Sequence, residues 1–160
     1  MAPIRDIVDS WAAFYAGSPV ARSAVTFTHV GALVVGGGSA IAADLGTVRA
    51  LRRDGPTLHA ELVRLHATHR LVTTSLALVV LSGILLMLAD FDAYLASRAF
   101  WLKMGLFGAL VVNGAMIVSL TGVTREASPR DRARLRLAAL ASLVLWMATT
   151  LLGTVVPNAM

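Results

Sequence analysis

Few side chains in this sequence can do chemistry, and its four histidines, at positions 29, 59, 66 and 69, are the most informative of them. The chain has no cysteine, which excludes disulfides, thiolate metal sites, iron–sulfur clusters and thioether-linked haem. It also has no serine-nucleophile elbow, paired catalytic carboxylates, phosphate loop or zinc-protease motif. The sequence therefore gives no sign of an enzyme acting alone, and ligation of a metal or cofactor is the chemistry that remains.

The composition predicts what must position these histidines. Of 160 residues, 57% are hydrophobic and 14% charged, whereas soluble domains have about a quarter charged residues. Each of four uncharged runs has the ~20 residues that a helix needs to cross ~30 Å of hydrocarbon. We predict a single all-α transmembrane domain over residues 1–160, an antiparallel four-helix bundle in a lipid bilayer. The predicted spans are residues 24–43, 71–89, 104–121 and 137–156.

The first residues predict a helix outside the bilayer core. Apolar residues recur there at helical spacing, and no uninterrupted apolar segment of a signal peptide is present. This pattern indicates an amphipathic helix over residues 3–16 that lies in the outer interface, with its aromatic side chains at headgroup level. A disordered tail is the alternative. The apolar residues are Ile4, Ile7, Val8, Trp11, Phe14 and Tyr15.

The basic residues predict the orientation of the bundle. The net charge is +5, and ten of the fourteen basic residues lie in or beside the first and third loops. By the positive-inside rule these two loops are cytoplasmic and both termini are outside. Topology thus explains the positive charge, and we expect no nucleic-acid partner. The ten residues are Arg49, Arg52, Arg53, Arg64, Arg70, Arg125, Arg130, Arg132, Arg134 and Arg136.

His29 lies inside the first predicted span, toward its outer end. A polar side chain at this depth is costly unless it has a partner. We consider a hydrogen bond to a neighbouring helix, ligation of a metal or cofactor, and a proton relay. A small-residue patch that includes Gly37 follows at residues 36–40. It favours close helix packing, and the alternative is a flat wall for a porphyrin or pigment.

The other three histidines share one face of a helix that begins near residue 57. His59, His66 and His69 fall within an arc of about 80° at 100° per residue. One interpretation is a basic stripe that faces lipid headgroups. The other is ligation, in which His66 and His69 share a metal or one of them holds haem iron. Asp44, at a similar depth, would then orient an imidazole as a hydrogen-bond partner.

Depth limits which groups can act together. His29 and His69 differ by about 20 Å along the membrane normal if the helices are level, too far to hold one iron between them. Met87 and Met104 lie at nearly the depth of His29. A metal site of His29, Met87 and Met104 would suit haem iron or Cu(I), and ordinary packing of the two methionines is the alternative. Nearer mid-membrane, we expect Asn113 to bond a neighbouring helix and Trp146 to pack inward.

Part of the sequence resembles known membrane proteins. Residues 97–107, SRAFWLKMGLF, continuing to Asn113 and Gly114, are similar to the start of a helix in copper-resistance D-type proteins. Four helices with intramembrane histidines are also similar to small four-helix b-type cytochromes. The resemblance implies a bacterial inner membrane protein, with haem b or copper carried on His29, His66 and His69. The chain is about half the length of a full copper-resistance D-type protein.

These observations lead to three hypotheses for function. The first is a membrane-embedded b-type haem or redox-cofactor protein that transfers electrons to a redox partner or to other membrane subunits. Its cofactor-binding residues would be His29, His66, His69, Gly37 and Asp44. The second is a cofactor-free accessory subunit that docks to a larger membrane complex through its glycine-rich face. The third is copper handling through His29, Met87 and Met104.

Overall fold

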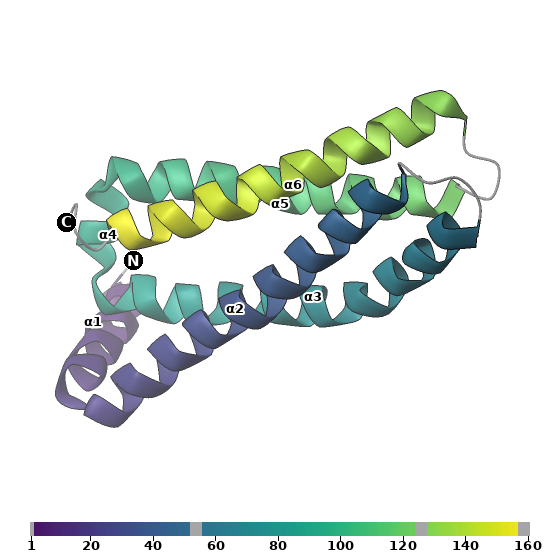
Figure 1. The fold of residues 1–160 in the computed structure, drawn as a ribbon. Coiled ribbons are helices and arrows are strands. Elements are labelled where there is room, and N and C mark those ends of the chain that lie inside the picture. The colour runs from purple at the N-terminus through teal and green to yellow at the C-terminus, as the bar shows by residue number, and fades with distance from the viewer. Residues whose placement is uncertain (1, 52–55, 124–127, 157–160) are drawn as a thin grey trace.

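The protein is an all-helical membrane protein. The computed structural model describes residues 2–51, 56–123 and 128–156, with side chains at 4–51, 68–120 and 128–156. These residues form six helices and no strand (Figure 1). The helices are α1 (Ala2–Gly17), α2 (Pro19–Ala50), α3 (Pro56–Ala89), α4 (Phe91–Ala96), α5 (Arg98–Val123) and α6 (Pro129–Val155).

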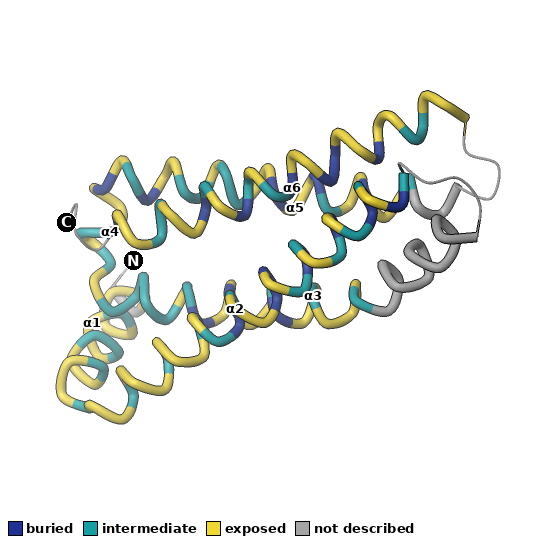
Figure 2. Tube along the Cα trace, in the orientation of Figure 1, coloured by how far each residue is buried: buried dark blue, intermediate teal, exposed yellow. Residues whose placement is uncertain are grey.

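Four of these helices, α2, α3, α5 and α6, are long and apolar enough to span a membrane, which confirms the four predicted spans. Their burial pattern is the inverse of a soluble protein's. Phe27, Val112 and Leu137 are 78%, 71% and 68% exposed, whereas Asp44 and Asn113 are buried. Figure 2 shows the exposed residues along the outward faces of the helices. Such a surface is stable only where hydrocarbon replaces water around it.

The spanning helices are longer than the uncharged runs because capping residues start them outside the apolar segments. Ser18 precedes Pro19, and its Oγ accepts a hydrogen bond from the Ala21 amide at 3.2 Å. Ser128 caps α6 in the same way, accepting from the Asp131 amide at 3.3 Å. A serine cap followed by proline stabilises a helix start by about 1 kcal/mol.

The bundle consists of two helical hairpins, α2 with α3 and α5 with α6, which contact each other through α2 and α6 (Figure 1). Glycines allow the close contacts of α2. A Cβ atom added at Gly36 would lie 2.5 Å from Ser75 Cβ of α3, and one at Gly37 would lie 3.2 Å from the Trp146 ring of α6. The small-residue patch therefore packs helices together, as expected in lipid. Trp146 is buried, as predicted.

The second hairpin is joined by a polar contact near mid-membrane. Asn113 Nδ2 of α5 donates a hydrogen bond to the Ala138 carbonyl of α6 at 2.9 Å, which confirms the predicted interhelical bond. Leu135 and Ala138 of α6 are almost completely buried and pack with Ile117 of α5. This tight hairpin fixes the wall that α5 and α6 present to α2 and α3.

The N-terminal residues form a helix, as predicted, so the disordered-tail alternative is wrong. The α1 helix packs on α2 and α3. Its Trp11 Nε1 donates to the Leu85 carbonyl at 2.9 Å, and Arg5 pairs with Asp92 at 2.8 Å. Ile4 and Ile7 remain 69% and 67% exposed, a face suited to the headgroup boundary. The short helix α4, which the sequence analysis did not predict, lies at the same end of the bundle (Figure 1).

Candidate functional site

A cavity of about 560 Å³ lies between the two hairpins, in the half of the bundle nearer to α1 and α4. All four spanning helices and α4 contribute to its wall, which is mostly apolar. Its volume is within the range of about 300–1,000 Å³ that binding sites for small molecules and cofactors occupy. Its polar residues are His29, Tyr94, Lys103, Thr149, Thr150 and Thr154.

His29 is held against the wall of this cavity by α3. Its Nδ1 lies 3.0 Å from Ser82 Oγ, and the carbonyl of Val79 also interacts with the ring. The Ser82 hydroxyl donates its single proton to the Leu78 carbonyl one turn earlier. Ser82 Oγ must then accept the proton on Nδ1, which leaves the lone pair of the imidazole on Nε2. Nε2 is the atom that can ligate a metal.

Two glycine positions shape the cavity around His29. A Cβ at Gly83 would lie 3.4 Å from His29 Cε1, so the imidazole packs against α3 where a side chain is missing. On α2, Gly37 and Gly38 line the cavity a little more than two turns after His29. Gly37 contacts Trp146, as the packing interpretation expects, and it also lines the cavity; a porphyrin at this wall stays a prediction.

Met87 of α3 and Met104 of α5 line the same cavity as His29. The structure thus brings together the three residues that depth alone had placed at one level. Thioether sulfur and imidazole nitrogen are ligands for haem iron and for Cu(I). Ligation by this set stays a prediction, since two methionines on a cavity wall are also ordinary packing residues.

His69 and Asp44 line a second, smaller cavity of about 100 Å³. Asp44 is 4% exposed, and its carboxylate accepts a hydrogen bond from Ser142 of α6. His69 is exposed, and its Nε2 lies 3.5 Å from Thr73 Oγ1 on its own helix. Both residues thus have hydrogen-bond partners other than each other, and Ser142 is the partner of Asp44 that the sequence analysis missed.

The structure separates His29 and His69, which line different cavities, in agreement with the depth argument. The side chains of His59 and His66 lie outside the described residues, so the proposed His66–His69 pair is not described. Within the described part of the chain, no three histidine, aspartate or glutamate side chains gather as a metal site. Of the candidate ligands, His29 therefore has the best-defined surroundings.

Three further residues of the cavity wall were not predicted from the sequence to belong to a site. Lys103 enters it from α5, Thr149 from α6 and Tyr94 from α4. Burial, and to a smaller extent the neighbouring Tyr15 and Asp90, raises the pKa of the Tyr94 phenol. A lysine within an apolar run was the available signal for Lys103, whereas Tyr94 is positioned by a helix that no periodicity predicted.

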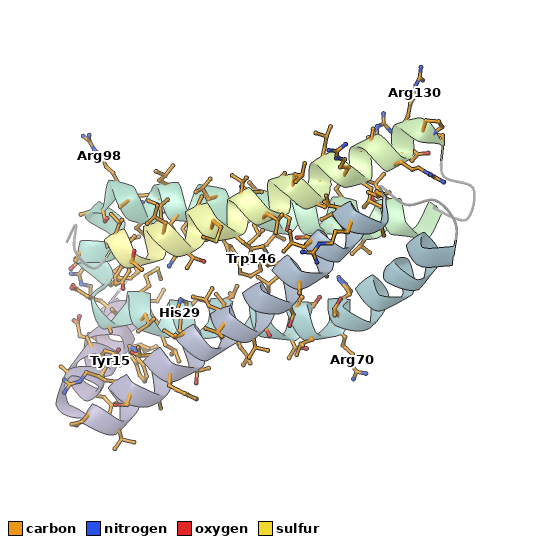
Figure 3. All side chains as sticks on the ribbon, in the orientation of Figure 1. Tyr15, His29, Arg70, Arg98, Arg130 and Trp146 are labelled. Atoms are coloured by element: carbon orange, nitrogen blue, oxygen red, sulfur yellow. The ribbon has the colours of Figure 1, made fainter. Side chains whose placement is uncertain are left out.

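Figure 3 shows His29 and Trp146 between the hairpins, with Arg98 and Arg130 pointing away at the two ends of the bundle. Charged side chains thus border the apolar region, and the imidazole of His29 lies within it. No protein-family model, curated protein or solved structure matches this chain. Function is therefore inferred from the geometry of the two cavities.

Proposed function

We propose that the protein binds a redox cofactor of the b-type haem class in the larger cavity, with His29 as the ligand, and transfers electrons within the membrane. The observation that carries the proposal is the hydrogen bonding and the position of the His29 imidazole. Its Nδ1–H donates a hydrogen bond to Ser82 Oγ, and its ring lines a cavity of about 560 Å³. Ligating histidines characteristically donate their second nitrogen to such a partner, which fixes the tautomer and the ring orientation.

The remainder of the wall fits a planar, largely apolar group. The wall is mostly apolar, Gly38 leaves open space on α2, and the rings of Trp146 and His29 lie beside Gly37 and Gly83. Met87 and Met104 are available as a second ligand to the metal. When bound, haem supplies reversible one-electron chemistry. The protein would contribute the axial ligand, the hydrogen bond on that ligand and a dry environment, which together set the reduction potential.

The proposal places the protein in a bacterial inner membrane with both termini outside. The positive-inside rule gives this orientation from the ten basic residues of the first and third loops. The larger cavity would then lie in the outer half of the bilayer, near α1 and α4. A redox partner or a neighbouring membrane subunit would exchange electrons with it there, because transfer requires a short distance to the cofactor.

Absorption spectroscopy of the detergent-purified full-length protein tests the proposal. We expect haem titrated into the protein to give a Soret band and a reducible α-band. His29→Ala should abolish both, and the matched control His69→Ala should retain them. Loss of the spectrum in His69→Ala instead would move ligation to the smaller cavity. A wild-type protein that takes up no haem would overturn the proposal.

Copper handling is the second candidate, because His29, Met87 and Met104 line one cavity. Metal analysis after incubation with Cu(I) distinguishes copper handling from haem binding. Stoichiometric copper, lost in Met87→Leu and Met104→Leu, would favour it over haem. A colourless, metal-free protein that copurifies with other membrane proteins would favour the accessory-subunit hypothesis instead.

A further inference from the structure

Lys103 lines the larger cavity and has no counter-ion among the residues that the structure describes. Lysine side chains near helix ends often extend along their own helix toward the membrane surface. The Nζ of Lys103 lies against α6, where a Cβ added at Gly153 would be 3.6 Å from it. Lys103 forms no ion pair with another described residue, and the Arg5–Asp92 pair lies at the surface of α1. A desolvated ammonium requires a paired anion to be stable.

Thr149 provides a second polar group on the same wall that lacks a partner. It is 5% exposed, and its Oγ1 has no hydrogen-bond partner in the described structure. A threonine in a membrane helix ordinarily bonds the carbonyl one turn earlier, as Thr47 does on α2. Buried hydroxyls are rarely left unsatisfied. This oxygen has almost no accessible surface, so a rotation about χ1 must bring it to the cavity before it can bond a ligand.

The two groups share one side of the cavity. Thr149 and Gly153 are four residues apart on α6, so they lie on the same helix face, one turn from each other. Lys103 Nζ packs beside Gly153, where an added Cβ would be in ordinary van der Waals contact with it. An ammonium and a hydroxyl about one turn apart can together donate hydrogen bonds to one carboxylate. The polar residue on the α2 side is His29.

We propose that the larger cavity selects apolar ligands that carry a carboxylate, and that Lys103 Nζ and Thr149 Oγ1 bind this carboxylate. The inference rests on the proposed function, since it assigns the anionic end of the ligand whose metal His29 would hold. A carboxylate can come from the side chain of a porphyrin or from a lipid acid. Both carry the same charge and geometry, and the experiment below distinguishes them.

The test compares each acid with its ester, which keeps the shape and removes the charge. Dissociation constants are measured for haem and haem dimethyl ester by absorption, and for palmitate and methyl palmitate by direct binding of the radiolabelled compounds. Wild type should bind the free acid at least ~10-fold more tightly, the effect of a charge-assisted hydrogen bond. Lys103→Met should lose this preference, and Lys103→Arg should keep it.

Controls separate a direct effect from a loss of structure or a change in partitioning. Arg98→Met removes an exposed cation from the same helix and should keep the wild-type preference, since Arg98 points away from the cavity (Figure 3). Thr149→Val keeps the shape of the side chain and should reduce the preference by a smaller factor. Because all variants are compared in one detergent, differences in micelle partitioning between acid and ester cancel.

A Lys103-dependent preference in the haem pair supports the proposal and identifies a cofactor carboxylate. The same preference in the palmitate pair alone supports it with a lipid acid as the ligand. If haem binds through His29 but acid and ester bind equally, this inference fails while the proposed function stands. If no haem binds to wild type and neither pair shows a preference, both fail.

Discussion

The hydrogen bond between His29 Nδ1 and Ser82 Oγ, 3.0 Å long, joins α2 to α3 at the wall of the larger cavity. Because Ser82 donates its own proton to Leu78, it receives the proton of the imidazole and directs the lone pair to Nε2. The geometry that a ligating histidine requires is thus present in the folded chain, and a single hydroxyl on the neighbouring helix controls it.

Removing this hydroxyl should weaken cofactor binding without removing the ligand. In Ser82→Ala the imidazole loses its orienting partner, and we expect haem affinity to fall by about 10- to 100-fold. Absorption titration of the purified protein measures the change. Ser119→Ala is the control, since Ser119 is exposed and bonds a carbonyl of its own helix. Equal affinities in Ser82→Ala and wild type would show that the bond does not orient a ligand.

The contact between Gly36 of α2 and Ser75 of α3 predicts a second effect, on stability. A Cβ at Gly36 would lie 2.5 Å from Ser75 Cβ, so Gly36→Ala must push α2 from α3. We expect a loss of about 1–3 kcal/mol, the usual cost of overpacking a core. Gly38→Ala adds the same methyl group where no atom lies within 4 Å and should be neutral or slightly stabilising. Thermal unfolding in detergent compares the two, and equal midpoints would contradict the packing argument.

The hydrogen bond between Asn113 and Ala138 predicts a smaller change in stability. Asn113→Leu removes the bond from the side-chain amide to the backbone of α6. Hydrogen bonds between membrane helices contribute about 0.6 kcal/mol on average and up to about 1.7 kcal/mol. We expect a destabilisation within that range, measured by reversible unfolding in mixed micelles. A gain in stability would mean that apolar packing outweighs the bond at this position.

The buried phenol of Tyr94 on α4 should make the stability of the protein depend on pH. Burial raises the pKa of its phenol above 10.0, so the folded protein holds this proton more tightly than the unfolded chain. The resulting stabilisation is complete below the unfolded pKa and is lost as the pH rises through the folded pKa. Titration of phenolate absorbance should show a late component that Tyr94→Phe removes. The variant should also lose less stability between pH 9 and pH 11, a range about 1 unit either side of the ordinary pKa of a tyrosine phenol.

The distribution of arginines predicts the orientation of the bundle in the membrane. Reporter enzymes that are active on only one side of the membrane, fused after α6, should report an outside location. Fusions in the first and third loops should report the cytoplasm. A cytoplasmic signal after α6 would reverse the orientation and place the larger cavity in the inner half of the bilayer.

The sequence predicts the four spanning helices well because span length and the absence of charge are properties of the chain itself. The interfacial helix over residues 3–16 follows from the spacing of its apolar residues. The Ser-Pro pairs at Ser18 and Ser128 also signal helix starts, which explains why α2 and α6 extend beyond the uncharged runs. The short helix α4 has no such signal, because six residues are too few to show a period.

The site is predicted only in part. Depth along the membrane normal can be counted in residues, and it correctly separates His29 from His69 and groups His29 with Met87 and Met104 around one cavity. Whether any of them ligates a metal stays a prediction. Rotation about each helix axis cannot be counted in the same way, so the partners of these residues, such as Ser142 for Asp44, were not found.

The sequence by itself determined that this chain forms four membrane-spanning helices and which residues share a depth, because lipid forces each apolar run into a helix of known rise. Only the tertiary structure decided that the hairpins meet through α2 and α6, that a cavity lies between them and that Lys103 and Thr149 face one side of it. The physical reason is that lipid solvates every apolar face equally, so hydropathy does not select helix neighbours. Small residues and buried hydrogen bonds select them instead.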